Sequence, residues 1–193
     1  MSTTLIVIIV IVVVLGLIFA GLYNGLVKLR NVVQESWAQI DVELKRRHDL
    51  IGNLVETVKG YASHERGTLD EVTRVRAAAM APNQSPAQAA ESEGALTRAL
   101  VNLQSVTEAY PDLKATANVA QLQEELTSTE NKIGFARQLY NDVATQYNTK
   151  QMLFPTSLIA GLAKAAPVEL WQLEDAAERA VPIVDLSMNK PAP

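Results

Sequence analysis

The chain has 193 residues, a net charge of −4 and no cysteine, and 48% of its residues are hydrophobic but only 5% aromatic. This length leaves room for one soluble domain beside a membrane segment, and the few aromatics predict a core of Leu, Val, Ile and Ala, as in helical bundles. The lack of cysteine excludes disulfides and thiolate metal sites, and no basic run is long enough to indicate nucleic-acid binding.

The first predicted element is a membrane anchor. From Leu5 to Leu22 no side chain is polar, and the first charge comes at Lys28. As a helix this run is long enough to cross most of the ~30 Å hydrocarbon core of a bilayer. A signal peptide has a charged start and a small-x-small cleavage site, a lipoprotein signal needs a cysteine, and a core helix is rarely apolar on every face. We therefore expect a short tail over residues 1–4 and an uncleaved transmembrane helix over 5–24.

The flanks and small residues of this segment carry further information. Lys28 and Arg30 follow the span, whereas only the amino group precedes it, so the basic residues predict an N-terminus outside and a cytoplasmic body. Small residues four apart let transmembrane helices approach closely. The membrane-spanning candidates are Leu5, Gly16, Ala20 and Leu22, and the small pairs are Gly16 with Ala20 and Gly21 with Gly25.

The pattern beyond the span is helical. From Leu26 to Gly60 apolar residues recur every three or four positions without a proline, which predicts one helix continuous with the membrane segment. Residues 60–67 are expected to break it. Thr68 with Glu71 then predicts an N-cap with a capping box. The sequence APNQSP at 81–86 predicts a turn.

The second half predicts further helices. One runs from Pro86 to Tyr110, and Pro111 ends or kinks it. A heptad pattern over 115–147 follows and predicts a coiled-coil seam. Phe154-Pro155 closes that helix, and short helices are expected over 157–164 and 170–179. The interface candidates on the seam are Val119, Leu122, Leu126, Ile133, Tyr140 and Tyr147.

These elements predict an all-α fold. A single N-terminal transmembrane helix continues into an elongated antiparallel helical bundle with coiled-coil-like packing over residues 25–165. Residues 166–193 form a C-terminal segment with a short helix and a frayed tail.

Several polar groups invite a functional interpretation. His48 and His64 are 16 residues apart, which on one helix puts them ~160° apart in azimuth, so we expect structural roles and no metal site. The basic run 45–47 is interpreted as solvated or paired with nearby acids. The frequent Asn residues suggest buried hydrogen bonds that fix helix register. No catalytic triad, P-loop, dinucleotide glycine motif or HExxH occurs, so no catalytic residue and no cofactor is predicted.

Ordered blocks of residues carry a family resemblance. They are Tyr23–Asn31, Gln39–Leu50, Asn53–Tyr61, Glu108–Lys114, Thr129–Ile133, Ala136–Asn141, Tyr147-Asn148 and Phe154-Pro155. Together they resemble the LemA family, which implies a bacterial membrane protein with one N-terminal span and a helical soluble domain. Relatives include a magnetosome-membrane protein, which points to roles in membrane organisation. Two features depart from the family pattern: Gly52 stands where a proline is expected, and the Ala-rich segment after Gly161 lacks a Phe-rich stretch, so nothing is carried over beyond it.

The sequence therefore predicts a non-enzymatic, membrane-anchored scaffolding or assembly protein that forms homo-oligomers through its helical rod. A shared membrane raises the effective concentration of such rods for lateral pairing. The alternative is an adaptor that presents a helical face to another membrane protein, such as an envelope-stress protease or a signalling partner. A third hypothesis is an enzyme or ligand sensor with a cleft between helices.

Overall fold

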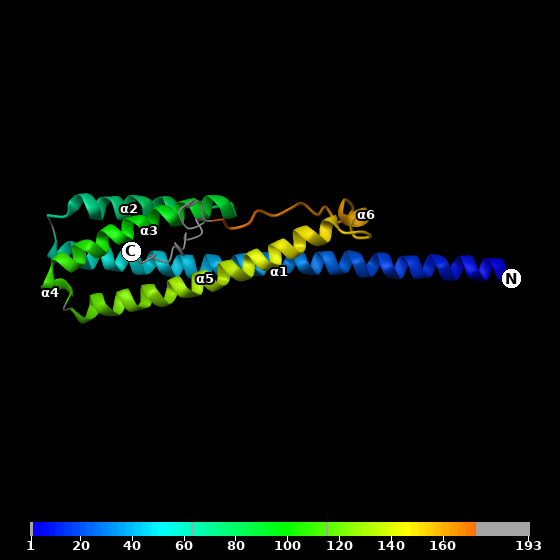
Figure 1. Cartoon of the computed structure of the whole chain (residues 1–193), viewed down its shortest axis with the longest axis horizontal. Coiled ribbons are helices and arrows are strands. Elements are labelled where there is room, and N and C mark those ends of the chain that lie inside the picture. Colours follow the sequence, from blue (N-terminus) through cyan, green and yellow to red (C-terminus); the bar gives the residue numbers. More distant parts are fainter. Residues whose placement is uncertain (1, 63, 115, 173–193) are drawn as a thin grey trace, which may run out of the picture.

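A computed structural model describes residues 2–62, 64–114 and 116–172 of the chain. Within these residues the protein is helical and has no strand, which confirms the all-α fold (Figure 1). The elements are α1 (Thr3–Tyr61), α2 (Arg66–Ala79), α3 (Pro86–Ala109), α4 (Pro111–Lys114), α5 (Ala117–Met152) and α6 (Ser157–Ala160).

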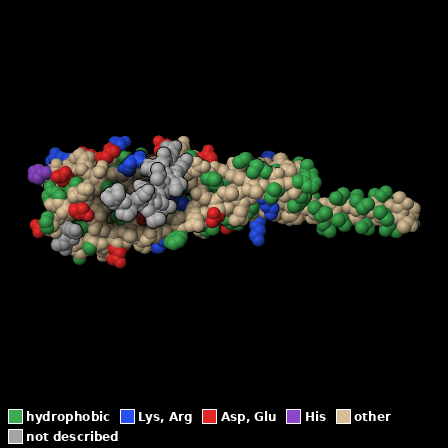
Figure 2. Space-filling model, viewed as in Figure 1, with side chains coloured by type: hydrophobic (Ala, Val, Ile, Leu, Met, Phe, Trp, Pro, Cys, Tyr) green, Lys and Arg blue, Asp and Glu red, His purple; other side chains and the backbone are tan. Residues whose placement is uncertain are grey.

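Helix α1 is one unbroken element of 59 residues that holds both the apolar run and the first helix of the bundle. At 1.5 Å per residue it is about 88 Å long. Its N-terminal part projects from the bundle as a single bare helix (Figures 1 and 2). The family resemblance leads one to expect a proline at position 52. This chain has Gly52 there, and α1 continues through it without a break.

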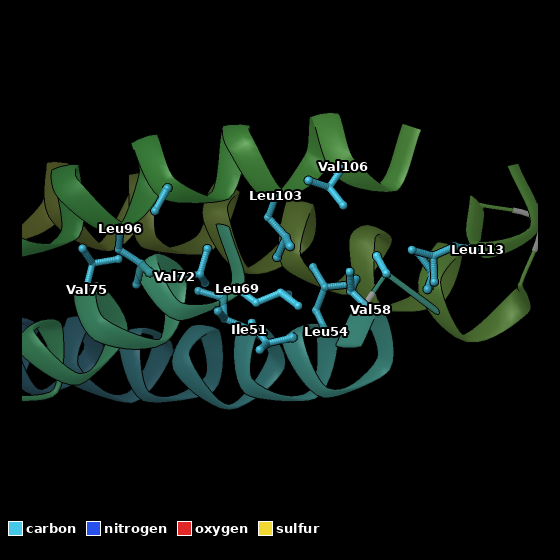
Figure 3. Close-up of a cluster of buried hydrophobic side chains, with 14 of the residues drawn as sticks. Ile51, Leu54, Val58, Leu69, Val72, Val75, Leu96, Leu103, Val106 and Leu113 are labelled. Atoms are coloured by element: carbon cyan, nitrogen blue, oxygen red, sulfur yellow. The ribbon is translucent and has the colours of Figure 1, made fainter. Parts of the chain in front are cut away.

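The bundle is built on two pairings of helices. Helix α5 packs antiparallel along α1, and α2 packs against both α3 and the distal part of α1 (Figure 1). The distal core lies between α1, α2 and α3 and is closed by α4 and the start of α5 (Figure 3). Burying a Val or Leu side chain contributes about 1.5–3 kcal/mol, so this cluster stabilises the end farthest from the apolar run. The residues labelled in Figure 3 are Ile51, Leu54, Val58, Leu69, Val72, Val75, Leu96, Leu103, Val106 and Leu113.

A second core lies nearer the apolar run, between α1 and α5. It begins at Leu26, the first buried residue of α1. Its centre is aromatic: the ring of Trp37 lies 5.4 Å from that of Tyr140 and 6.0 Å from that of Trp171. Arg137 stacks on Trp171 at 5.8 Å. Aromatic pairs at these distances add stability beyond the burial of their area.

The helix starts differ in one respect from the prediction. Helix α2 begins at Arg66, and its N-cap Glu65 makes no side-chain cap bond, so the predicted N-cap at Thr68 is wrong. The helical hydrogen bonds already start at Glu65, whose carbonyl accepts from Leu69 N. A full capping box occurs instead at α3, where Ser85 and Gln88 bond each other's backbone.

The C-terminal elements are shorter than predicted. Helix α6 ends at Ala160 rather than at residue 164, and residues 170–172 are not helical. Residues 165–172 form an irregular segment that lies along α5, which we call the strap. The rest of the predicted helix 170–179, and the predicted frayed tail, lie outside the described residues.

Candidate interaction surfaces

The apolar part of α1 is buried against no other part of the described protein. One window of this helix is apolar and long enough to cross a membrane, and none of that window is buried inside the protein. Leu5, Gly16 and Ala20 are exposed and Leu22 is half-buried, and a side chain added at Gly16 would meet nothing within 4 Å. The segment is therefore compatible with a single-pass anchor. Its exposed surface is available to lipid or to a second span.

A buried network of charges connects α1 to α3. Arg47, 4% exposed, donates from Nη1 to Glu93 Oε2 at 2.8 Å and from Nη2 to Thr97 Oγ1 at 2.8 Å. His48 Nε2 lies 2.6 Å from Glu93 Oε1. On α5, Glu130 completes the network at 3.1 Å from Arg47 Nη2. Every partner of the guanidinium thus lies on another helix, and the network fixes the register of three helices.

This network corrects the interpretation of the basic run. Arg47 pairs with distant acids on other helices rather than with its neighbours in sequence. Arg46 also reaches across, to Glu125 at 3.9 Å. His48 is hydrogen-bonded and buried, as a structural role requires. The described residues contain no group of three or more His, Asp or Glu that would suit a metal ion.

The predicted seam residues all lie on the inner side of α5. Val119, Ile133, Tyr140 and Tyr147 are at most 2% exposed. Leu122 and Leu126 are partly buried against the distal core. These side chains are therefore occupied within one chain. A contact between two copies would have to use other residues.

Two asparagines on α5 bind the backbone of the strap. Asn141 donates to Trp171 O and accepts from Trp171 N, both at 2.9 Å. Asn148 makes the same pair of bonds to Val168, at 2.8 and 2.9 Å. Asn141 and Asn148 are seven residues apart on the helix, a rise of about 10.5 Å. Their partners Trp171 and Val168 are three extended residues apart, which covers about 10 Å, so each asparagine meets its own partner. The expectation that Asn residues fix packing thus applies to the strap rather than to helix–helix register.

The outer face of the α1–α5 pair carries an exposed apolar patch, which we call the lateral patch. Val42 is 65%, Phe135 74% and Leu139 45% exposed. They line a shallow depression of about 850 Å³ together with Glu43 and Lys132. Glu43 Oε2 is buried at its edge and has no hydrogen-bond partner among the described residues. Large exposed apolar side chains rimmed by charges are typical of interaction sites. The heptad pattern did not reveal them, because they lie outside the seam.

A second surface is a groove between α3 and α5. Its volume is about 560 Å³, and α1 contributes Arg47 and Leu54 to its lining. Val101, 59% exposed, lines it from α3. Within the lining, Gln123 Nε2 of α5 donates to Thr107 Oγ1 of α3 at 3.4 Å. The groove is mixed in character, with amides and hydroxyls among leucines.

Comparison with known proteins identifies relatives of the chain. The LemA family model matches residues 36–186, so the resemblance continues past Gly161, where the sequence had led us to stop it. Protein LemA of Metamycoplasma hominis is 25% identical over 82% of this chain and 72% of its own length. Magnetosome proteins MamQ 1 and MamQ 2 of Paramagnetospirillum magneticum are each 24% identical over 81% of this chain. The matched region spans 66% of the length of these two magnetosome proteins.

Proposed function

Because the chain belongs to the LemA family, we propose that it is a non-enzymatic, membrane-anchored assembly protein whose rods associate side by side. The observation that carries this proposal is the lateral patch, where Val42, Phe135 and Leu139 stand exposed on one face. The transmembrane span of the protein would hold the helical body on the cytoplasmic side, because Lys28 and Arg30 follow the apolar run.

The anchor restricts how two copies can meet. Rods that leave one membrane in the same direction are related by a two-fold axis parallel to their length, and residues at equal height then face each other. Trp37 on α1 packs against Tyr140 on antiparallel α5. Moving five residues away from the membrane leads from Trp37 to Val42 on α1 and from Tyr140 to Phe135 on α5. Val42 and Phe135 therefore lie at the same distance from the membrane, which we call their height. A two-fold contact would place each Phe135 ring against Val42 of the other copy.

The charges around the lateral patch fit the same arrangement. Glu43 and Lys132 lie about two residues, or 3 Å, apart in height. The two-fold contact brings Lys132 of one copy toward Glu43 Oε2 of the other, a buried atom that bonds to none of the described residues. An isologous interface contains this pair twice. Pairing a buried carboxylate removes the cost of leaving it unsatisfied.

The size of the patch predicts modest affinity in solution. Stable complexes bury about 800 Å² per partner, more than a few side chains supply. Anchoring in one membrane raises the effective concentration, so a weak lateral contact is sufficient there. We therefore expect association to depend on protein density in the membrane.

The test compares full-length variants in vesicles at several protein-to-lipid ratios, with proximity measured by energy transfer between labelled copies. Wild type should associate as density rises, and Phe135→Glu should remain monomeric at densities where wild type pairs. Val101→Glu, at a similarly exposed apolar position on α3, is the matched control and should pair normally. Monomeric wild type at every density would overturn the proposal, as would unchanged pairing of the Phe135 variant.

The adaptor function is a second candidate, and the α3–α5 groove favours it. A groove lined by leucines and amides suits a helix or extended segment of a partner membrane protein. In that case Val101→Glu would abolish capture of a stoichiometric partner in cross-linked membranes, while Phe135→Glu would leave it intact. The two variants therefore separate the two functions within one experiment.

A further inference from the structure

The end of the bundle nearest the apolar run carries a second set of exposed apolar side chains. They lie at the end of α5, on the α5–α6 turn, on α6 and just after it, and Figure 2 shows hydrophobic side chains gathered where the bare helix leaves the bundle. Single exposed hydrophobic residues are ordinary on protein surfaces, but five within eleven positions are not. We call this set the collar: Met152 (74% exposed), Leu153 (57%), Phe154 (80%), Leu158 (71%) and Leu162 (70%).

The collar lies level with the point where α1 would leave the hydrocarbon. Helix α6 contacts α1 beside the start of the bare segment (Figure 1). On α5, Lys150 Nζ lies so close to α1 that a Cβ at Gly25 would be 3.1 Å away. The apolar run ends at Leu22, and α1 is first buried at Leu26, four residues or about 6 Å later. The headgroup layer of one leaflet is about 5–7 Å thick. The base of the bundle therefore lies within that layer.

The collar is held rigidly in this position. Ile159 and Thr156 are only 6% and 4% exposed and fix α6 to the bundle. Leu158 on α6 and Leu162 just beyond its end are both exposed, so their side chains face away from the bundle. The backbone of the turn bonds internally, with Ser157 N donating to Leu153 O at 2.9 Å. Backbone groups that bond internally in this way lower the cost of bringing the segment into an apolar medium.

The charges around the collar have one sign. Residues 1–34 and 143–168 contain Lys28, Arg30, Lys150 and Lys164 and no acidic residue. The whole chain has a net charge of −4, so the remainder has a side-chain charge of −8. The basic end therefore coincides with the end that would face the membrane. Basic residues near a leaflet are attracted to anionic lipids, each by about 1 kcal/mol.

From these observations we propose that the collar is a second membrane-contacting element, which inserts Phe154, Leu158 and their neighbours into the same leaflet that α1 leaves. The bound partner is the lipid surface itself, with anionic headgroups held by the surrounding lysines and Arg30. Insertion on one side of α1 gives the rod a defined tilt and a defined rotation about its axis. A helix with a single span and no such collar would be free to rotate.

The chain has no cysteine, so single labels can be introduced cleanly. Phe154→Cys and Leu158→Cys in the full chain are labelled with a nitrobenzoxadiazole fluorophore and reconstituted at low density into phosphatidylcholine vesicles with or without phosphatidylglycerol. Lipids spin-labelled near the top of the acyl chain serve as quenchers. Val101→Cys, exposed on α3 in the distal half of the bundle, is the matched control. Circular dichroism verifies that each labelled variant keeps its helical content.

We expect blue-shifted emission and strong quenching at residues 154 and 158, and water-like emission without quenching at residue 101. Quenching at 154 and 158 no greater than at 101 would overturn the proposal. A blue shift that disappears on dilution into excess lipid would also overturn it, because it would indicate a second copy as the partner. Phosphatidylglycerol should increase the quenching, and Lys150→Gln with Lys164→Gln should reduce that increase. Equal quenching in both lipids would overturn the role of the charges.

Discussion

His48 and Glu93 share a hydrogen bond of 2.6 Å between Nε2 and Oε1, and both residues are at most 5% exposed. The other carboxylate oxygen of Glu93 accepts from Arg47 at 2.8 Å. One acidic side chain of α3 therefore satisfies two neighbouring residues of α1. A buried charge without such partners is costly, so the helices are held to the alignment in which all three groups meet.

Replacing Glu93 should destabilise the bundle strongly. Glu93→Gln keeps the shape but removes the negative charge, which leaves Arg47 with the more exposed Glu130 as its acidic partner. Breaking a buried ion pair typically costs about 3–5 kcal/mol of unfolding free energy. Guanidinium unfolding of the full chain in detergent, followed by circular dichroism, measures the loss. Glu125→Gln, which removes the exposed 3.9 Å contact to Arg46, is the control and should cost under about 1 kcal/mol.

Removing Asn148 should release the strap without unfolding the helices. Asn148→Ala removes both bonds to Val168, and each hydrogen bond contributes on the order of 1 kcal/mol. Hydrogen exchange at the Val168 amide should therefore accelerate about tenfold or more, while exchange within α1 stays unchanged. Asn131→Ala, at an exposed position of α5, serves as the control. Equal protection of Val168 in both variants would contradict this role of Asn148.

Tyr140 should make the bundle sensitive to alkaline pH. Burial raises the pKa of its hydroxyl above the usual 10.0, and the charge of Glu169 raises this pKa further. Ionisation is thus easier in the unfolded chain, so this contribution to stability is complete below about pH 10 and is lost as the pH rises through the folded pKa. Unfolding free energies measured between neutral pH and pH 11 should fall less steeply for Tyr140→Phe than for wild type.

The same substitution has a cost at neutral pH. Tyr140→Phe loses the 2.6 Å bond from the hydroxyl to Glu169 O, which should lower stability by about 1 kcal/mol. Tyr61→Phe is the control, because Tyr61 is 55% exposed, and it should keep both the neutral stability and the alkaline slope of wild type. A Tyr140 variant with the wild-type slope would show that another group dominates the alkaline response.

The effect of a Gly52→Ala substitution on stability should depend on the side chain of Arg76. The guanidinium lies across this glycine, its Nε donates to His48 O at 2.6 Å, and an added Cβ would be 3.1 Å from its Nη2. In an Arg76→Ala background, Gly52→Ala should stabilise the chain by about 1 kcal/mol through helix propensity. In the wild-type background the gain should be smaller, because the guanidinium must move. A double-mutant cycle measures the difference, and an equal gain in both backgrounds would contradict the contact.

The parts of the fold that depend on local pattern could be predicted from the sequence. The apolar run and the three-to-four periodicity to Gly60 required only neighbouring residues, and α1 follows them. The turn at 81–86 was equally local. The capping-box signature was less specific: it was placed at Thr68, whereas Ser85 with Gln88 forms the box. Such four-residue patterns occur often, and only the surrounding hydrogen bonds decide which of them caps a helix.

The parts that depend on distant residues could not be predicted. Arg47 pairs with Glu93, 46 residues away, so no short-range rule on charge spacing finds it. The strap has no periodicity of its own, because its position comes from side chains of α5. The lateral patch and the collar became visible only once the inner faces of α1 and α5 were known, since exposure is a property of the packed bundle.

The continuity of α1 also has a mechanical consequence. From Leu22 to Tyr61 the helix extends about 58 Å beyond the apolar run without a break. A change of about 10° in the tilt of this helix would displace its far tip by about 10 Å. Because α2 and α3 pack against that tip, the tilt that the collar sets at the membrane surface would also set where the distal end of the bundle lies.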